Sequence, residues 1–193
     1  LLTSAEAYTG TAWTPLPPMP HIAYYATACV LNGRLYVIGG VRSKKLQVLE
    51  MTEENGLSWS RKADLPAQRY DAASAVHDGK IWVFGGCVGG SASASVITYD
   101  AEADTWATGP SLPKSYGAFT AFDIGGQIYA AGRRRNFLYN TAWSQVAGGV
   151  CDGEDLTSAE AYTGTAWAPL PPLPHAVWGA TACVLNGRLS VMG

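Results

Sequence analysis

A long internal repeat is the feature that most limits how this chain can fold. Residues 2–39 match residues 156–193 at an offset of 154, with 30 of 38 positions identical. Between these copies the pair Gly39-Gly40 recurs as Gly85-Gly86 and then as Ala131-Gly132, each time 46 residues later. Repeats of this length predict a chain in which one supersecondary unit is copied and stacked.

Each copy contains the signals of a β-hairpin. An apolar or small-residue segment leads into a two-residue turn, and a second apolar segment follows. Both central residues of a type I′ turn need positive φ, which Asn, Asp and Gly adopt most easily. The four turns are Asn32-Gly33, Asp78-Gly79, Gly125-Gly126 and Asn186-Gly187. The hairpins are expected to supply the first two strands of each unit.

The rest of each unit predicts two more strands. A third strand is expected in segments such as TSAEAY and SASVITYD, and a fourth around a tryptophan. The fourth strand ends at prolines, whose missing N–H groups stop strand pairing. Four of these prolines precede a fixed second-strand position by 15 residues: Pro20, Pro66, Pro113 and Pro174. The sequence therefore predicts an all-β fold, a β-propeller with four-stranded antiparallel blades.

The combination of a glycine doublet, a tyrosine, a tryptophan and a proline-rich exit resembles the kelch repeat. Its motif residues are Gly39, Gly40, Gly85, Gly86, Gly132, Gly148, Gly149, Tyr8, Tyr99, Tyr162, Trp13, Trp59, Trp106 and Trp167. The second unit departs from the pattern with Leu49 or Met51 where a tyrosine is expected, and the third has Ala131 for a glycine. Residues 133–149 interrupt the last unit, either as a long loop or as a repeat shortened by deletion.

The repeats are expected to form one domain over residues 1–193, with units of approximately 1–40, 41–86, 87–132 and an irregular 133–193. Counting half-units gives about four blade-equivalents. Either the two ends combine in one blade and close a four-bladed ring, or the chain is an arc of a larger propeller. The resemblance slightly favours the arc, because kelch-like rings usually have more blades. An arc exposes blade faces and allows self-association.

Composition excludes several functions. A net charge of −2 offers no broad basic surface for nucleic acid. No apolar run reaches the roughly 20 residues that cross a bilayer. Four cysteines without CxxC spacing, and no recognisable signal peptide, favour a cytoplasmic protein with reduced thiols. No His/Cys cluster, P-loop, HExxH or GxSxG motif is present, so no metal, cofactor or enzymatic activity is expected.

Candidate binding residues lie in two loop sets at one end of the predicted propeller, one after the proline stops and one after the glycine doublets. They are Tyr24, Tyr25, Arg69, Tyr70, Tyr116, Trp178, Arg133, Arg134 and Arg135. Aromatic residues and arginine are favoured at the centres of protein interfaces. The arginine run either meets an acidic peptide or phosphate, or is simply solvated.

One loop differs between the two near-identical copies of the repeat. Of eight differing positions, four are consecutive, Ile22–Tyr25 against Ala176–Gly179. This concentration indicates a surface diversified for contact, although loops also tolerate substitution. In kelch-like binding domains these loops line a ligand-facing mouth, and an arginine often stands where this chain has Arg69.

The predicted function is therefore a protein–protein interaction module that holds a peptide or protein segment at one mouth. A substrate-adaptor role follows if an oligomerisation domain accompanies the repeats. The resemblance leaves two alternatives open. One is a kelch-type sugar oxidase or epimerase, for which the candidate residues are His21, His175, Tyr116 and Arg69. The other is a cytoskeletal protein that binds actin.

Overall fold

A computed structural model of the chain describes residues 3–8, 10–52, 56–132, 159–162, 165–169, 181–185 and 188–192. Within these residues every regular element is a β-strand, and the strands form three four-stranded and three two-stranded sheets. All paired strands run antiparallel. The all-β expectation and the four-stranded antiparallel blades are confirmed.

The four-stranded sheets are the blades. Blade 1 contains β3 (Thr27–Leu31), β4 (Arg34–Ile38), β5 (Leu46–Thr52) and β6 (Gly56–Arg61). Blade 2 contains β7 (Ala73–His77), β8 (Lys80–Phe84), β11 (Val96–Asp100) and β12 (Thr105–Thr108). Blade 3 contains β13 (Phe119–Ile124), β14 (Gln127–Gly132), β15 (Ala159–Tyr162) and β16 (Trp167–Pro169).

The two-stranded sheets are smaller. A hairpin of β1 (Ala5–Tyr8) and β2 (Trp13–Leu16) precedes blade 1. A second hairpin, of β17 (Thr181–Leu185) and β18 (Arg188–Met192), follows blade 3. Between them, β9 (Cys87–Val88) and β10 (Ser91–Ala92) make a short ribbon after the second glycine doublet.

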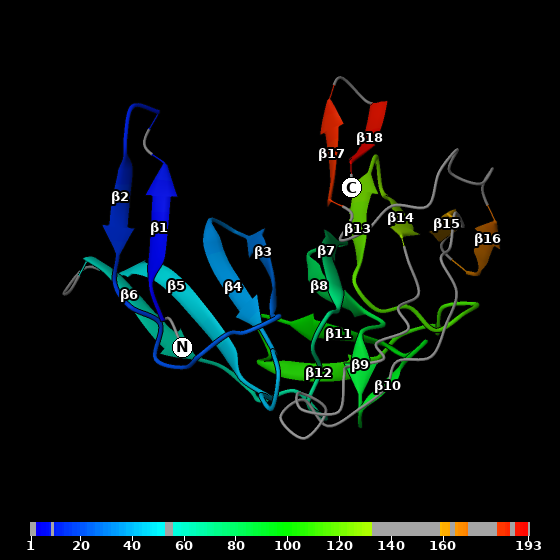
Figure 1. Ribbon diagram of the computed structural model, residues 1–193, viewed down its shortest axis with the longest axis horizontal. Coiled ribbons are helices and arrows are strands. Elements are labelled where there is room, and N and C mark those ends of the chain that lie inside the picture. Colours follow the sequence, from blue (N-terminus) through cyan, green and yellow to red (C-terminus); the bar gives the residue numbers. More distant parts are fainter. Residues whose placement is uncertain are drawn as a thin grey trace, which may run out of the picture.

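The sheets follow one another around an arc, with β1–β2 at one end and β17–β18 at the other (Figure 1). The first strand of each blade lies toward the centre of the arc. Successive first strands are neighbours in space, β3 beside β7, β7 beside β13 and β13 beside β17. This is the arrangement of a β-propeller, in which blades stack because one blade cannot cover both of its own faces.

The hairpin turns have the predicted chemistry. Leu31 pairs with Arg34, so the turn between them has two residues, Asn32 and Gly33, with φ values of 51° and 72°. The turn at Asp78 and Gly79 repeats this geometry with φ values of 47° and 69°. Positive φ at both central residues matches the right-handed twist of the flanking strands. These turns set the register of the first two strands in each blade.

The tyrosine and tryptophan of the repeat are cross-strand partners. Tyr99 on β11 lies opposite Trp106 on β12, with ring centroids 5.0 Å apart. In blade 1 the residue opposite Trp59 is Leu49, so Leu49 rather than Met51 occupies the tyrosine position. Because Leu49 is buried and Met51 is 72% exposed, the leucine also takes over the packing role of the tyrosine.

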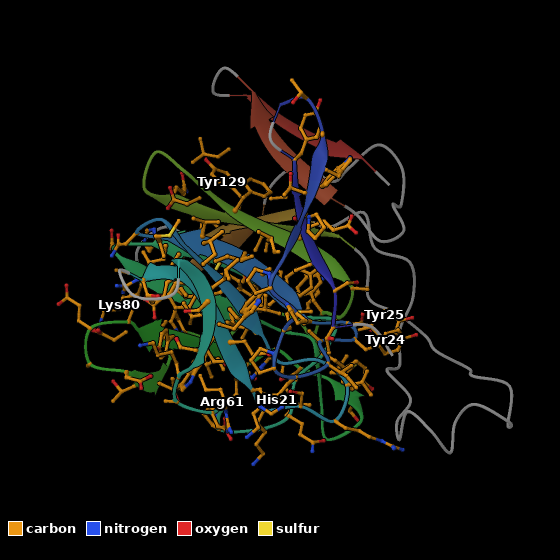
Figure 2. All side chains as sticks on the ribbon, turned by 90° about the vertical axis from the view of Figure 1, so that its left-hand side faces the viewer. His21, Tyr24, Tyr25, Arg61, Lys80 and Tyr129 are labelled. Carbon is orange, nitrogen blue, oxygen red and sulfur yellow. The ribbon has the colours of Figure 1, made fainter. Side chains whose placement is uncertain are left out.

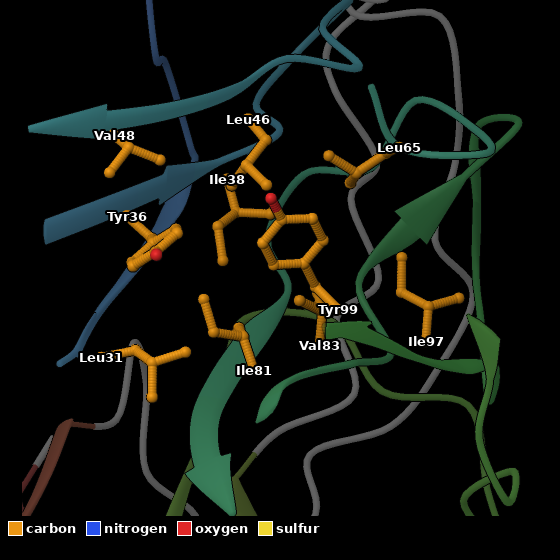
Figure 3. Packing of buried hydrophobic residues seen from close by; sticks show 10 residues of the cluster. All are labelled: Leu31, Tyr36, Ile38, Leu46, Val48, Leu65, Ile81, Val83, Ile97 and Tyr99. Carbon is orange, nitrogen blue, oxygen red and sulfur yellow. The ribbon is translucent and has the colours of Figure 1, made fainter. Parts of the chain in front are cut away.

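The main core lies between blades 1 and 2. Figure 3 shows Tyr36, Ile38, Leu46 and Val48 of blade 1 facing Ile81, Val83 and Tyr99 of blade 2. Each such side chain, when fully buried, contributes roughly 1.5–3 kcal/mol to stability. A second cluster, which includes Phe84, Val96, Phe119 and Ile128, joins blades 2 and 3. Packing between blades therefore fixes the angle from each blade to the next.

The repeat tryptophans of blades 1 and 2 also reach back to the preceding unit. The indole N–H of Trp59 donates to the carbonyl of Pro17 across 2.6 Å, and that of Trp106 donates to Ala63 across 2.9 Å. Pro17 and Ala63 follow Trp13 and Trp59 by the same number of residues. Each of these half-buried indoles thus has its polar partner supplied by the repeat itself.

The two ends of the arc do not share a sheet in the described residues. The hairpins β1–β2 and β17–β18 are separate two-stranded sheets, so the mixed blade of a closed four-bladed ring is not formed there. Residues 133–149 lie outside the described residues. Because β14 and β15 are adjacent in blade 3, the chain between Gly132 and Ala159 joins its second and third strands.

Candidate functional site

A chain of backbone hydrogen bonds links the loops at one end of the blades, here called the mouth. The N–H of Asp71 donates to the carbonyl of Tyr25 across 3.0 Å, and the N–H of Ala118 donates to Asp71 across 2.9 Å. The three residues occupy equivalent repeat positions, and all have positive φ, of 56°, 53° and 52°. Non-glycine residues hold this conformation only where the surroundings enforce it. The mouth loops are therefore locked to one another.

The glycine doublets lie directly beneath these loops. The N–H of Gly40 donates to the carbonyl of Arg69 across 2.8 Å, and that of Gly86 donates to Tyr116 across 2.7 Å. Gly86 has a φ of 78°, and a Cβ there would lie 2.6 Å from the carbonyl oxygen of Tyr70. Only glycine allows both the positive φ and this close approach. The doublet is thus the part of the repeat that joins each blade to the mouth.

Tyr24 and Tyr25 form an exposed aromatic pair at the mouth. Their side chains are 55% and 40% exposed, their ring centroids lie 4.2 Å apart, and both project beyond the ribbon in Figure 2. The hydroxyl of Tyr25, followed by weaker effects that include Asp71, raises the pKa of Tyr24. The carbonyl of Tyr24 accepts from the N–H of Val41 across 2.8 Å, which ties this loop to the segment after the first doublet.

A buried glutamine anchors the start of the same loop. Gln47 is fully buried on β5, and its side-chain oxygen accepts from the N–H of His21 across 2.8 Å. Its side-chain nitrogen donates to the carbonyl of His21 across 3.0 Å. One side chain thus satisfies both backbone groups of His21, which would otherwise be left without partners beside the core. The histidine is held through its backbone.

Arg69 is buried beneath the mouth with an exposure of 4%. Its guanidinium donates to the carbonyl of Gly85, to the carbonyl of Ser95 across 3.2 Å and to the hydroxyl of Ser95 across 2.8 Å. Burial lowers the pKa of Arg69 to about 10. Among the described residues no carboxylate forms an ion pair with it, and its Nε has no hydrogen-bond partner. The arginine therefore braces the second doublet and the segment between β10 and β11.

The other predicted loop residues divide by burial. Tyr116 is 2% exposed and packs against Phe119, with ring centroids 5.3 Å apart. Tyr70 is half-buried, and burial raises its pKa. Its N–H and carbonyl both bond to the backbone of Cys87. Trp178, Arg133, Arg134 and Arg135 lie outside the described residues, so their contribution to the mouth stays a prediction.

Exposed basic side chains stand in other loops of the mouth. Arg42 and Lys44 are exposed in the loop after the first doublet, and Lys114 is exposed at the start of a third loop. Lys44 makes one long bond, 3.4 Å, to the carbonyl of Pro66. The described loop segments 21–25, 41–45, 67–71 and 114–118 contain one acidic residue, Asp71, and it is half-buried. The described part of the mouth thus carries a local excess of positive charge.

Sequence reasoning missed the residues that brace the mouth from below. Gln47 and Ser95 carry no motif, and only their contacts reveal a role. His77 was also missed: its Nδ1 lies 2.6 Å from Asp123 on the neighbouring blade, at the opposite end of the first strands. The sequence did contain a signal for this pair, because His77 and Asp123 both lie in first strands close to the hairpin turn of their blade.

The cysteines differ from the expectation of reduced thiols. Cys29 is a free thiol on β3, and burial raises its pKa to about 12. Cys87 is 1% exposed and disulfide-bonded. The sparse spacing of the four cysteines in the sequence therefore did not predict the redox state of Cys87.

The described residues contain no cluster of three or more His, Cys, Asp or Glu side chains that could hold a metal ion. They also form no helix with the length and apolar character needed to cross a membrane.

Comparison with known proteins identifies the repeat. A sequence profile described as the kelch motif matches residues 23–51 and 68–113, which include both intact glycine doublets and the Tyr99–Trp106 pair. The chain carries kelch repeats. An F-box/kelch-repeat protein of Arabidopsis thaliana is 34% identical over 104 residues, which cover 53% of this chain and 24% of that protein. The kelch chain thus spans about a quarter of the curated relative it matches.

A solved structure supports the same fold. The structure of YjhT superposes on this kelch chain with a TM-score of 0.66 at 19% identity. The match covers 86% of this chain and 56% of the YjhT chain. At this identity the likeness concerns the fold alone. It supports the β-propeller fold.

Proposed function

We propose that the mouth of this kelch chain binds a segment of another protein, with Tyr24 and Tyr25 as the main contacts. The observation that carries the proposal is that two exposed aromatic rings stand on a loop whose backbone is locked on both sides. Large aromatic side chains contribute most to protein interfaces when they are held in place before binding. The bonds Asp71–Tyr25 and Val41–Tyr24 provide this restraint.

The charge around the pair favours a partner with acidic side chains. Arg42 and Lys44 follow Val41, whose N–H bonds to the carbonyl of Tyr24, so the loop bonded to the tyrosine loop carries exposed positive charge. Charged groups at an interface rim mainly guide association and selectivity. Arg69 acts from below as a positioning residue, because its guanidinium holds Gly85 and Ser95. Trp178 and the run Arg133–Arg135 belong to the same proposal as further contacts.

The F-box/kelch-repeat relative supports an adaptor role for this chain. Kelch repeats commonly serve as protein-interaction modules, and the Arabidopsis relative combines them with an F-box. We infer that this chain presents its mouth to a protein client in the same general manner. The client is the segment held at Tyr24 and Tyr25, and a further domain would couple it to other machinery.

The test is selection from a displayed library of random peptides, followed by affinity measurement of the selected peptides. Tyr24→Ala with Tyr25→Ala is expected to weaken binding at least tenfold, as at interface anchors. Tyr8→Ala is the matched control, because Tyr8 is 58% exposed but stands on β1 away from the mouth. Equal affinity of the double variant and the wild type would refute the proposed face.

The sequence predicts a cytoplasmic location. The disulfide of Cys87 bears on this prediction, because disulfides form mainly in oxidising compartments. Thiol alkylation and mass spectrometry of the protein from its native cells would decide this. A reduced Cys87 supports the cytoplasm, and an oxidised Cys87 contradicts it.

A further inference from the structure

Two serines of blade 1 are each followed directly by two basic residues. Ser43 begins the segment SKK, and Ser60 begins the segment SRK. Protein kinases select their substrates partly by such charge patterns, because acidic groups beside the kinase active site attract basic side chains next to the target serine. The sequence alone gives no reason to prefer one serine over the other, so the fold decides between them.

Ser60 is held in a strand and beside a carboxylate. It lies within β6, where it pairs with Val48 of β5, so its backbone changes conformation only if the strand pairing breaks. Its hydroxyl donates to the carboxylate of Glu50 across 3.1 Å. A phosphate at this position would lie next to that carboxylate, and the two negative groups would repel each other. The fold therefore disfavours modification of Ser60.

Ser43 lies in a turn between β4 and β5. Its N–H donates to the carbonyl of Gly40 across 3.1 Å, and Arg42 within this turn has a positive φ of 58°. The hydroxyl of Ser43 accepts the N–H of Lys45 across 3.1 Å, so a backbone donor already points toward this side chain. Surface turns open locally at a lower cost in free energy than strands inside a sheet. Ser43 is therefore the serine that a kinase reaches more easily.

The charges next to Ser43 favour a phosphate. Arg42 and Lys44 are exposed on either side of it, and Lys45 pairs with Asp64 across 2.6 Å. Three cations and one carboxylate leave this loop with two positive charges in excess. A serine phosphate carries about −1.5 to −2 charges at pH 7 and forms charge-assisted hydrogen bonds with basic side chains. It would therefore cancel the positive charge of the loop.

We propose that Ser43 is a phosphorylation site for a protein kinase that selects basic residues after the serine. The serine oxygen attacks the γ-phosphorus of ATP, the bond from that phosphorus to the ADP oxygen breaks, and the hydroxyl proton passes to a base of the kinase. Val41 of the same loop donates its N–H to the carbonyl of Tyr24 across 2.8 Å. Phosphorylation thus removes positive charge beside the tyrosine pair and weakens the binding of an acidic partner. This consequence rests on the proposed function, whereas the modification itself does not.

The first test compares the two serines in the folded chain. It uses a purified kinase that modifies both synthetic peptides 39–49 and 56–66, in which each serine has the same place. In the intact chain, mass spectrometry is expected to find Ser43 modified at least about tenfold faster than Ser60. Ser43→Ala is expected to remove most of the incorporated phosphate. Equal rates at the two serines, or no phosphate on Ser43 in the intact chain, would overturn the proposal.

The second test measures the affinity of an acidic peptide selected for binding at the mouth. Phosphorylation of Ser43 is expected to weaken this affinity by about threefold to tenfold, and the effect should shrink at high salt. Ser43→Ala removes the hydroxyl without adding charge and should leave the affinity unchanged. If no peptide binds through Tyr24 and Tyr25, the proposed function fails while the modification of Ser43 stands. If the peptide binds and the phosphate leaves its affinity unchanged, the regulatory role of Ser43 is wrong.

Discussion

The N–H of Asp71 donates to the carbonyl of Tyr25 across 3.0 Å, although the two residues belong to different blades and lie 46 positions apart. Both residues have positive φ, and Ala118 continues the chain of bonds from Asp71. The exposed Tyr25 thus stands on a backbone whose shape is set by the neighbouring blade. Loop sequence can vary at this mouth while the loop path stays the same.

Ala118→Gly is expected to stabilise the fold. Ala118 has a φ of 52°, a conformation that disfavours L residues by roughly 1–2 kcal/mol and costs glycine almost nothing. Because glycine also makes the unfolded chain more flexible, the expected net gain in the free energy of unfolding is about 0.5 kcal/mol. Urea denaturation measures it. Ala121→Gly on β13, where φ is not positive, should instead destabilise, and a loss at both positions would contradict the argument.

Gly86→Ala is expected to destabilise far more than Gly79→Ala. Both glycines have positive φ, 78° and 69°, so both substitutions carry backbone strain. A Cβ at Gly86 would also lie 2.6 Å from the carbonyl of Tyr70, whereas nothing lies within 4 Å of one at Gly79. We expect about 1 kcal/mol of destabilisation at Gly79 and at least 3 kcal/mol at Gly86. Similar thermal midpoints for the two variants would show that the doublet is not a close-contact site.

Gln47→Ala is expected to destabilise the fold and to loosen the loop that carries Tyr24. The substitution removes both bonds to the backbone of His21 and leaves its N–H and carbonyl beside the core without partners. The expected loss is about 2 kcal/mol of unfolding free energy. Faster amide exchange at residues 21–25 is the specific readout. Gln127→Ala, the same change at the first residue of β14, beside the hairpin turn at the other end of blade 3, should leave exchange at residues 21–25 as it is.

Asp104 makes the free energy of unfolding depend on pH in the acidic range. The Tyr99 hydroxyl donates to it across 2.6 Å and the Ala63 N–H across 2.8 Å, and these bonds, the tyrosine first, lower the pKa of Asp104 below 3.8. A lowered pKa in the folded state means that the contribution is complete above pH 3.8 and is lost as the pH falls through the lowered value. Asp104→Asn should therefore flatten the dependence of stability on pH below 3.8.

Chemical denaturation between pH 2.5 and 7 provides the measurement for Asp104. Glu102→Gln, which removes an exposed carboxylate of the same turn, is the control and should keep the wild-type slope. If Asp104→Asn kept that slope as well, the bonds from Tyr99 and Ala63 would not favour the charged form.

Local chemistry allowed much of the blade to be predicted. Asn32-Gly33 and Asp78-Gly79 specify their turns through φ alone, and the prolines stop pairing because they lack an N–H. The spacing from tyrosine to tryptophan likewise specified their pairing across two strands. The identity of the residue opposite Trp59 remained open between Leu49 and Met51, because the sequence alone did not settle the register of β5 against β6.

The mouth was predicted less well. Arg69, Tyr70 and Tyr116 were singled out together with Tyr24 and Tyr25 as contact residues, yet the structure buries Arg69 and Tyr116 and leaves Tyr24 and Tyr25 exposed. Sequence gives the residue type and its repeat position. It does not give the depth of a side chain below a loop, because that depth depends on the blade packed beside it.

The sequence by itself determined that this protein repeats a four-stranded antiparallel unit, since turn chemistry, strand alternation and proline stops act over a few residues. Only the tertiary structure decided which side chains the blades cover and how far the blades turn around the axis. Those properties arise where residues far apart in the sequence pack together, as Tyr36 does with Ile81, 45 positions later, and with Tyr99, 63 positions later. Such packing depends on the shapes of two blades at once and cannot be assigned to either one alone.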